Sequence, residues 1–337
     1  MSAFLPSFCP RAACPSRTGS ALFSFYRDGT FPRAADGRRV TRFRCKACRH
    51  RFSAQSFRLD FRHQKPHLNT SILSFLVSKV SLRQTARILG VDRKTVHHRL
   101  RLYGHALEEL HQAFLLRAVR NGGLFGSFSL DELETFEHNR RLQPLTVPVL
   151  IHRPTRFLVH LEVGKLPARG GLKGRDLERK AAQGPRQSES TVMVRRCLEA
   201  LKRVHEPGEL LQLVMDQKRT YRPLVKQVFG NRIAALVTES SKRARNPANP
   251  LFAINHTLAT LRDHASRLVR RTWGCTKRAR ELRRHCWVVA AWKNYGRPAS
   301  NRMRRASAGM MLGLTDRIWS LAELLRWRWP RLSLAAA

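Results

Sequence analysis

Acidic residues are scarce in this chain of 337 residues, which has 23 aspartates and glutamates against 64 lysines and arginines. The formal net charge is +41. Positive charge in such excess destabilises a compact fold by self-repulsion unless a polyanion neutralises it. We therefore expect a nucleic acid as the main partner of the protein.

Long apolar runs are also missing, because no stretch of 18 or more apolar residues occurs. The sequence thus predicts no membrane-spanning helix and no membrane partner. The first residues, MSAFLPSFCPRAAC, lack the charged and apolar regions of a signal peptide, which predicts a cytoplasmic protein. With 42% hydrophobic residues the chain can still bury a core, and its length predicts about two domains with a small third module.

Cysteine is sparse as well, and four of the seven cysteines stand in two close pairs near the N-terminus. Cys9 and Cys14 form the first pair, and Cys45 and Cys48 form the second. Two short loops that each carry two thiolates suit a tetrahedral Zn²⁺ site. The alternative is disulfides or free thiols, and a reducing cytoplasm disfavours disulfides. We predict a zinc ribbon over residues 1–64, in which metal binding supplies folding energy.

Residues 65–104 carry the pattern of short helices joined by a tight turn. Ser81 and Asp92 stand where helix N-caps are expected, and Gly90 stands where the helix between them must end. This spacing predicts a helix-turn-helix. Five side chains of its second helix are predicted to point outward, toward a DNA major groove: Arg93, Lys94, His97, His98 and Arg101. The alternative is an ordinary helical hairpin with a solvated basic face.

The remainder divides into a linker helix over residues 105–123, a domain over residues 124–295 and a basic tail over residues 296–337. The apolar segments of the domain predict three antiparallel strands, then a helix and a strand, again a helix and a strand, and a final helix. A piece rich in Gly, Lys and Arg, residues 164–190, has no periodicity and is predicted to be a mobile loop.

Two of the predicted strands end on an aspartate, Asp131 in FGSFSLDELE and Asp216 in LLQLVMDQ. If these strands pair in one sheet, the two carboxylates lie side by side, which is the minimum needed to hold a hard cation such as Mg²⁺ or Mn²⁺. Taken singly, each aspartate could equally start a turn or cap a helix. The order of the elements, with acids at the first and fourth strands, describes a ribonuclease-H-like layer.

The cysteine pairs, the segment LRQTARILGVDRKTVHHRL, the acids at 131, 132 and 216 and the segment LRDHASRLVRRTW together resemble DDE transposases of bacterial insertion sequences, of the insertion-sequence-one type. The resemblance covers most of the chain, from residue 9 to residue 295. It implies a nuclease and strand-transfer enzyme that uses bound Mg²⁺ or Mn²⁺. It also implies a homo-oligomer on double-stranded DNA, bound to the terminal repeats of its own mobile element.

The third metal ligand departs from the family pattern. Alignment on LRDHASRL places Asn255 where the resemblance calls for a glutamate. An amide oxygen can ligate Mg²⁺ but brings no charge, which weakens the site. Asp263 lies on the same predicted helix and Glu239 ends a neighbouring strand, so each is an alternative ligand. The chain therefore uses a substitute ligand or is catalytically impaired.

These observations predict an α+β multidomain protein with a zinc ribbon, a helix-turn-helix three-helix unit and a ribonuclease-H-like mixed sheet with flanking helices. The expected function is a nucleoid-associated transposase with Asp131, Asp216 and Asn255 as catalytic residues. Arg270, Arg271 and Arg283 belong to a basic stretch expected to contact the DNA backbone. One alternative is a DNA-binding regulator descended from a transposase. Another is an RNA-binding protein, which fits the charge but not the helix-turn-helix.

Overall fold

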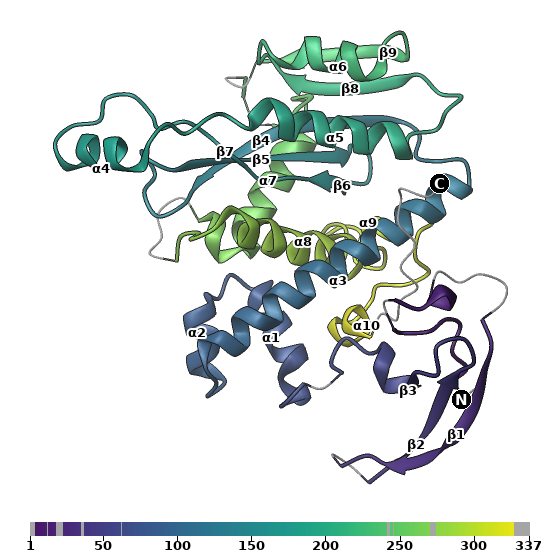
Figure 1. Cartoon of the computed structure of the whole chain (residues 1–337). Coiled ribbons are helices and arrows are strands. Elements are labelled where there is room, and N and C mark those ends of the chain that lie inside the picture. The colour runs from purple at the N-terminus through teal and green to yellow at the C-terminus, as the bar shows by residue number, and fades with distance from the viewer. Residues whose placement is uncertain are drawn as a thin grey trace. The chain divides into compact units, whose positions relative to one another are not determined.

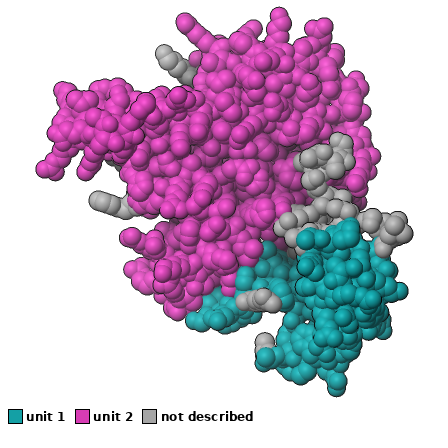
Figure 2. Space-filling view, in the orientation of Figure 1, with its two compact units in different colours: residues 1–69, 325–337 teal, residues 70–324 magenta. Residues whose placement is uncertain are grey.

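The computed structural model contains two compact units, residues 1–69 with 325–337 and residues 70–324, which have separate colours in Figure 2. The first unit holds a three-stranded antiparallel sheet, and the second holds a six-stranded mixed sheet with flanking helices (Figure 1). The expected mixed α+β class is confirmed. The structure describes residues 4–11, 13–17, 23–34, 37–61, 63–240, 243–244, 246–269 and 274–326.

The first unit is built on β1 (Phe25–Pro32), β2 (Arg39–Cys45) and β3 (Arg51–Ser53), which pair in that order. Its small core consists of phenylalanines and cysteines. Because this core has few buried side chains, it supplies little hydrophobic stabilisation. The unit therefore needs a further source of folding energy. Three 3-10 turns complete the unit: Pro15–Arg17, Ala54–Phe57 and Pro66–Leu68.

The second unit begins with α1 (Asn69–Leu76), α2 (Leu82–Ile88) and α3 (Arg93–Arg120). These helices are anchored to the rest of the unit, since a ring nitrogen of His285 lies 2.8 Å from the carbonyl oxygen of Leu76. In the part of the chain that the structure describes, no helix has both the length and the apolar character needed to cross a bilayer.

The capping residues expected from the sequence are found in their places. The hydroxyl of Ser81 accepts a hydrogen bond from the backbone N–H of Gln84 (3.3 Å), which caps α2. The carboxylate of Asp92 accepts one from the N–H of Lys94 (2.6 Å), which caps α3. Between them Gly90 has a φ of +59°, a left-handed conformation that favours glycine. The turn between α2 and α3 is therefore specified locally.

The helix α3 is continuous over 28 residues, so the boundary expected between residues 104 and 105 falls in its middle. Gly104 is the point where α3 meets α8 (Ala279–Tyr295). A Cβ atom at Gly104 would lie 2.6 Å from the Cβ of Arg284 and 2.8 Å from its carbonyl oxygen. The glycine does not end a helix; it lets two helix backbones approach closely.

We expect the substitution Gly104→Ala to lower the free energy of unfolding by about 1–2 kcal/mol, because crowding costs roughly 1–3 kcal/mol and the better helix propensity of alanine returns up to about 1 kcal/mol. Urea unfolding followed by circular dichroism measures the change. Gly170→Ala is the control, since a Cβ there meets no atom within 4 Å. Equal stability of the two variants would contradict the close approach.

The six-stranded sheet has the order β6-β5-β4-β8-β9, with the short β7 paired to β5. β4 runs antiparallel to β5, and β5 antiparallel to β6, whereas β8 and β9 run parallel to β4. All residues of β5 and β6 are buried, as their apolar runs predict. The strands are β4 (Ser127–Phe136), β5 (Pro144–His152), β6 (Phe157–Leu161), β7 (Gly164–Lys165), β8 (Leu211–Asp216) and β9 (Ile233–Glu239).

Helices cover both faces of this sheet. α5 and α6 contact the face to which Glu132 of β4 points, through Ser190 and Tyr221. α7 packs against β4 and β5 on the opposite face, where the adjoining 3-10 turn Ser266–Leu268 meets Thr135 of β4. The bounds are α4 (Arg175–Gln183), α5 (Ser190–Val204), α6 (Tyr221–Phe229), α7 (Phe252–His264), α9 (Ala308–Met311) and α10 (Leu321–Leu325).

Residues 164–190 were expected to form a loop without secondary structure, but they contain β7 and α4. No residue of α4 is buried. In the expected basic tail, α9 and α10 fall within the described residues. The N–H of Trp319, between them, donates to the carbonyl of Tyr295 at the end of α8 (2.8 Å), so this part of the tail packs on its own unit.

Candidate functional site

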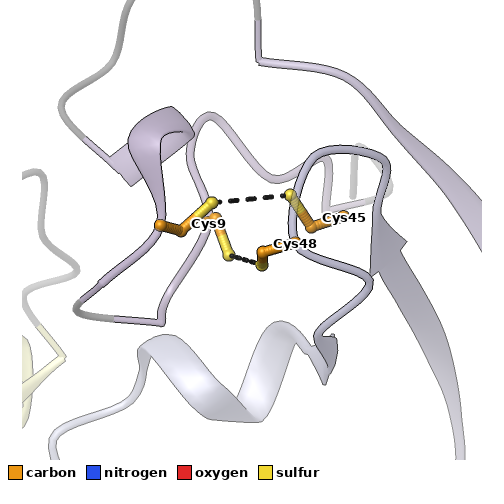
Figure 3. Close-up of side chains that lie close together, drawn as sticks. Cys9, Cys45 and Cys48 are labelled. Carbon is orange, nitrogen blue, oxygen red and sulfur yellow. Dashed lines mark hydrogen bonds between the residues drawn. The ribbon is translucent and has the colours of Figure 1, made fainter.

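Two short turns of the first unit bring four cysteines together. The backbone N–H of Cys14 donates to the carbonyl of Arg11 (3.1 Å), which closes the first turn. In the second turn, directly after β2, the N–H of Arg49 donates to the carbonyl of Cys45 (3.0 Å), and Arg49 has a left-handed φ of 61°. Both turns direct their sulfurs to one point, as Figure 3 shows for three of them.

The geometry of this cysteine cluster fits one tetrahedral metal ion. The Sγ atoms of Cys9 and Cys48 are 3.6 Å apart, and those of Cys14 and Cys45 are 3.8 Å apart. All four sulfurs lie within 4.8 Å of one another. A tetrahedral site with Zn–S bonds of about 2.3 Å needs S–S separations of roughly 3.8 Å. The four cysteines could therefore bind a metal such as zinc, and the cluster is compatible with a zinc ribbon.

The thiols of the cysteine cluster differ in acidity. Burial raises the pKa of Cys9 and of Cys14. Burial also acts against the thiolate of Cys48, but a hydrogen bond to the backbone of His50 and those to the other thiols outweigh it and lower its pKa to about 7. A divalent cation stabilises thiolates strongly, so it would be bound with release of protons from the buried thiols.

In the second unit, Asp131 and Asp216 lie on neighbouring strands at the same level. The register of the parallel pair β4 and β8 runs to Leu130 opposite Met215, one residue before the two aspartates. Because side chains alternate along strands, both aspartates point to the same face of the sheet, with a strand separation of about 4.8 Å. The sequence prediction that the two carboxylates share one sheet edge has this geometric basis.

Glu239 extends this row by one strand, because it is the register partner of Asp216 in β9. Its carboxylate accepts hydrogen bonds from the N–H of Ser240 (2.9 Å) and from Arg243 (2.5 Å), which lower its pKa. Among the described residues, only the four cysteines form a group of three or more potential ligands within 4.8 Å of one another. The three carboxylates are thus a spaced row, not a closed cage.

The helix α7 contacts β4 and β5. Near its start, Arg153 links the helix to β4: its guanidinium donates to the carbonyl of Pro250 (3.2 Å), and its backbone N–H donates to the carbonyl of Ser127, the first residue of β4 (2.8 Å). Near its end, the guanidinium of Arg262 donates to the carbonyl of Glu134 (3.5 Å). The helix and the strand therefore run in the same direction.

Asn255 falls between these two anchor points, five residues after Pro250 and seven before Arg262. Since seven residues make about two helical turns, Asn255 lies on the same side of α7 as Arg262, which contacts β4. The half-buried Asn255 is thus on the face of the sheet to which Asp131 points.

Asp263 is not brought to this row. Its side chain is 71% exposed and its carboxylate lies 3.3 Å from the ammonium of Lys79, in the loop between α1 and α2. It stands at the far end of α7, next to Arg262. Of the three alternatives for a third ligand, Asp263 is therefore the one whose carboxylate is directed away from the row of aspartates, toward Lys79.

Burial raises the pKa of Asp216, and the charge of Glu132 adds to that rise. A hydrogen bond from the backbone N–H of Lys218 (3.1 Å) acts in the opposite direction. The carboxylate of Asp131 accepts a hydrogen bond from the N–H of Glu132 (2.7 Å). Carboxylates that are half-buried and close to other acids favour a bound cation, and hard oxygen donors suit Mg²⁺ or Mn²⁺.

Glu132 is the centre of a polar cluster that sequence reasoning did not find. Its carboxylate accepts hydrogen bonds from Thr146 (2.8 Å), Ser190 (2.6 Å) and Tyr221 (2.8 Å), and it forms an ion pair with Lys218. Only 8% of the Glu132 side chain is exposed. By strand alternation Glu132 lies on the face opposite Asp131, but nothing in the sequence marks its four partners, which come from β5, α5, α6 and the loop between β8 and α6.

Lys218 connects this cluster to the row of acids. Its backbone N–H donates to Asp216, while its ammonium contacts Glu132 and the hydroxyl of Ser190 (2.9 Å). Burial acts against the charged form of Glu132, but Lys218 and the hydroxyl donors outweigh it and lower the pKa of this carboxyl. One lysine therefore ties the end of β8 to the residue that follows Asp131 in β4.

The outward residues of the helix-turn-helix are found on the first turns of α3. Arg93, Lys94, His98 and Arg101 are exposed, whereas His97 is half-buried and its Nε2 lies 3.1 Å from a carboxylate oxygen of Glu281 in α8. His97 therefore contacts its own unit, which makes it a weaker candidate for contacting DNA bases. The helix α3 still presents a basic surface at its N-terminal end.

Of the basic residues expected to follow the DNA backbone, Arg270 and Arg271 lie outside the described residues. Arg283 is directed inward, where its guanidinium contacts Glu108 (2.5 and 2.8 Å) and Glu162 (2.8 and 3.2 Å). These two acids, remote in sequence, convert an expected surface cation into part of an internal ion network.

No protein-family model and no curated protein matches the chain.

Proposed function

We propose that this chain is a DNA transposase that binds the ends of its own mobile element and cuts and joins DNA in a metal-dependent reaction. The observation that carries the proposal is the placement of Asp131 and Asp216 at one level of two neighbouring parallel strands. The strand order, with three antiparallel strands followed by two that run parallel to the first, supports a ribonuclease-H-like layer.

In the proposed site, Asp131 and Asp216 would hold Mg²⁺ or Mn²⁺, with Asn255 or Glu239 as a further oxygen donor. Such a cation, when bound, stabilises the negative charge that develops on a reacting phosphate. The protein's own groups fix the geometry: Lys218 orients Asp216 through its backbone N–H, and the anchors at both ends of α7 hold Asn255 beside β4. With Asn255 as that donor, the site would carry less negative charge than a triad of acids; with Glu239 it would be such a triad.

The N-terminal parts would supply DNA binding in this proposal. The exposed Arg93, Lys94 and Arg101 suit phosphates and base edges of a major groove, and the cysteine cluster suits a zinc ribbon. The net charge of +41 supports a polyanionic partner. Paired DNA ends require at least two active sites, so a homo-oligomer on DNA is part of the proposal.

The test is the substitution Asp216→Asn. We expect it to reduce divalent-metal-dependent nicking of a duplex that carries the DNA flanking the reading frame by roughly 100-fold or more, since one lost carboxylate removes charge stabilisation worth several kcal/mol. Binding of the same duplex should not change. Asp263→Asn is the matched control, because this exposed carboxylate pairs with Lys79 away from the row of acids. Lost binding with retained nicking would contradict the proposal.

A second candidate function is a DNA-binding regulator without catalysis, descended from such an enzyme. The amide of Asn255 and the spaced arrangement of the three carboxylates favour it. The same assay separates the two: intact duplex binding without nicking in Mg²⁺ or Mn²⁺ would support the regulator.

A further inference from the structure

The first unit contains a pocket of about 400 Å³ on one face of its sheet. Arg27 of β1 and Phe43 of β2 are register partners, so both face this pocket, and Arg39 and Thr41 face it by strand alternation. Arg33 and Arg58 complete the basic part of the lining. The pocket lies entirely within the first unit.

Lysines and arginines outnumber the acids of the first unit. Residues 1–69 contain 14 lysines and arginines but only three aspartates and no glutamate. Of these acids, Asp60 is held by Arg58 through two hydrogen bonds (2.7 and 2.6 Å), and Asp28 pairs with Arg51 (2.7 Å). Arg39 donates to the hydroxyl of Thr30 (3.3 and 3.2 Å) and not to a carboxylate. The pocket thus suits an anion.

The pocket also has an apolar and aromatic part, formed by Phe4, Val40 and Phe43. The rings of Phe4 and Phe43 are in edge contact, with centroids 6.0 Å apart. Aromatic rings and guanidinium planes bind the faces of unpaired bases, whereas a base inside a duplex cannot enter a pocket. A volume of about 400 Å³ lies within the range of small-molecule sites and accommodates one nucleotide.

We propose that this pocket, which we call the arginine pocket, binds an unpaired nucleotide of a DNA strand. The base would lie against Phe4, beside Val40, and the adjoining phosphates would contact Arg27 and Arg39. The inference rests on the proposed function in taking DNA as the partner. It adds that the first unit recognises frayed or single-stranded DNA, apart from any duplex reading by α3.

The experiment measures binding of the full, zinc-loaded chain to a blunt duplex and to the same duplex with a short 3′ overhang, without added Mg²⁺ or Mn²⁺. We expect the overhang to be bound about tenfold more tightly, the effect of stacking one or two bases. The double variant Arg27→Ala and Arg39→Ala should lose this preference. Arg44→Ala is the matched control, since Arg44 lies on β2 but faces away from the pocket and contacts the carbonyl of Arg49 (3.3 Å).

A second measurement uses a fluorescent adenine analogue, 2-aminopurine, in the overhang. Stacking in the arginine pocket of the unmodified protein should change its emission, and the double variant should abolish that change. Equal binding of both duplexes, unchanged emission, or a preference for an RNA overhang over DNA would overturn the proposal, as would equal competition by an acidic peptide. Because these measurements need no cleavage, Asp216→Asn should keep the overhang preference, which separates a failure of this inference from a failure of the proposed function.

Discussion

Removal of the metal from the four-cysteine cluster is expected to unfold the first unit and to leave the second unit folded. The core of the first unit is a handful of phenylalanines and the cysteines themselves, so little else opposes its chain entropy. Structural zinc contributes about 10–16 kcal/mol to the folding of small modules of this kind. Loss of that contribution exceeds any stability expected from so small a core.

Limited proteolysis before and after chelation measures this effect, because cleavage should become fast within residues 4–61 and remain slow in α3, α5 and α8. Cys45→Ser should reproduce the result of chelation, since a serine cannot replace a thiolate ligand. Cys275→Ser is the control, because this cysteine lies outside the cluster. A purified protein without bound zinc, whose first unit nevertheless resists protease, would contradict the metal site.

The second large effect is expected from Glu132→Ala, which should lower the free energy of unfolding by about 3 kcal/mol. Breaking a buried ion pair by removing one partner costs roughly 3–5 kcal/mol, because the other groups lose their partner. The lower end applies here, since the side chain of Lys218 is 39% exposed and can turn toward water. The hydroxyls of Ser190 and Tyr221 lose an acceptor as well.

Glu134→Gln is the matched control for this substitution, since Glu134 lies on the same strand and the same face as Glu132. Its side chain is 56% exposed and pairs with Arg169, so a change below about 1 kcal/mol is expected. Denaturant unfolding of the three proteins gives the comparison. Similar losses for both variants would show that the buried cluster contributes no more than an ordinary surface pair.

Glu132 should also make stability depend on pH. The folded-state pKa lies below the ordinary value of 4.5, so the stabilisation is present above pH 4.5 and is lost as the pH falls through the folded-state pKa. Glu132→Gln should flatten this acidic part of the stability profile. An unchanged profile would assign the acid sensitivity to other carboxylates.

The local signals in the sequence were sufficient for α2, the turn after it and the start of α3. Ser81, Gly90 and Asp92 each act on their own backbone or on residues two or three positions away, so their roles do not depend on the rest of the fold. The strand that ends at Asp216 was equally visible, because its apolar run is a continuous segment of strand length, but β4 continues for five residues past Asp131, where the strand was predicted to end.

What the sequence did not reveal depends on partners far along the chain. Gly104 was taken for the end of a helix, because only the presence of α8, almost 180 residues later, distinguishes a helix crossing from a break. Arg283 was predicted to lie on the surface, because its partners Glu108 and Glu162 are far from it in the sequence. The side chains around Glu132 likewise converge only in the folded sheet.

The continuity of α3 has a mechanical consequence. A helix of 28 residues is a rod about 42 Å long, with its basic surface at one end and, further along, the crossing with α8 at Gly104. A rod without a joint transmits rotation, so its basic end and the sheet would turn as one body. If the unit reads and cuts DNA as proposed, the length of this helix would fix the number of base pairs between the recognised sequence and the cut.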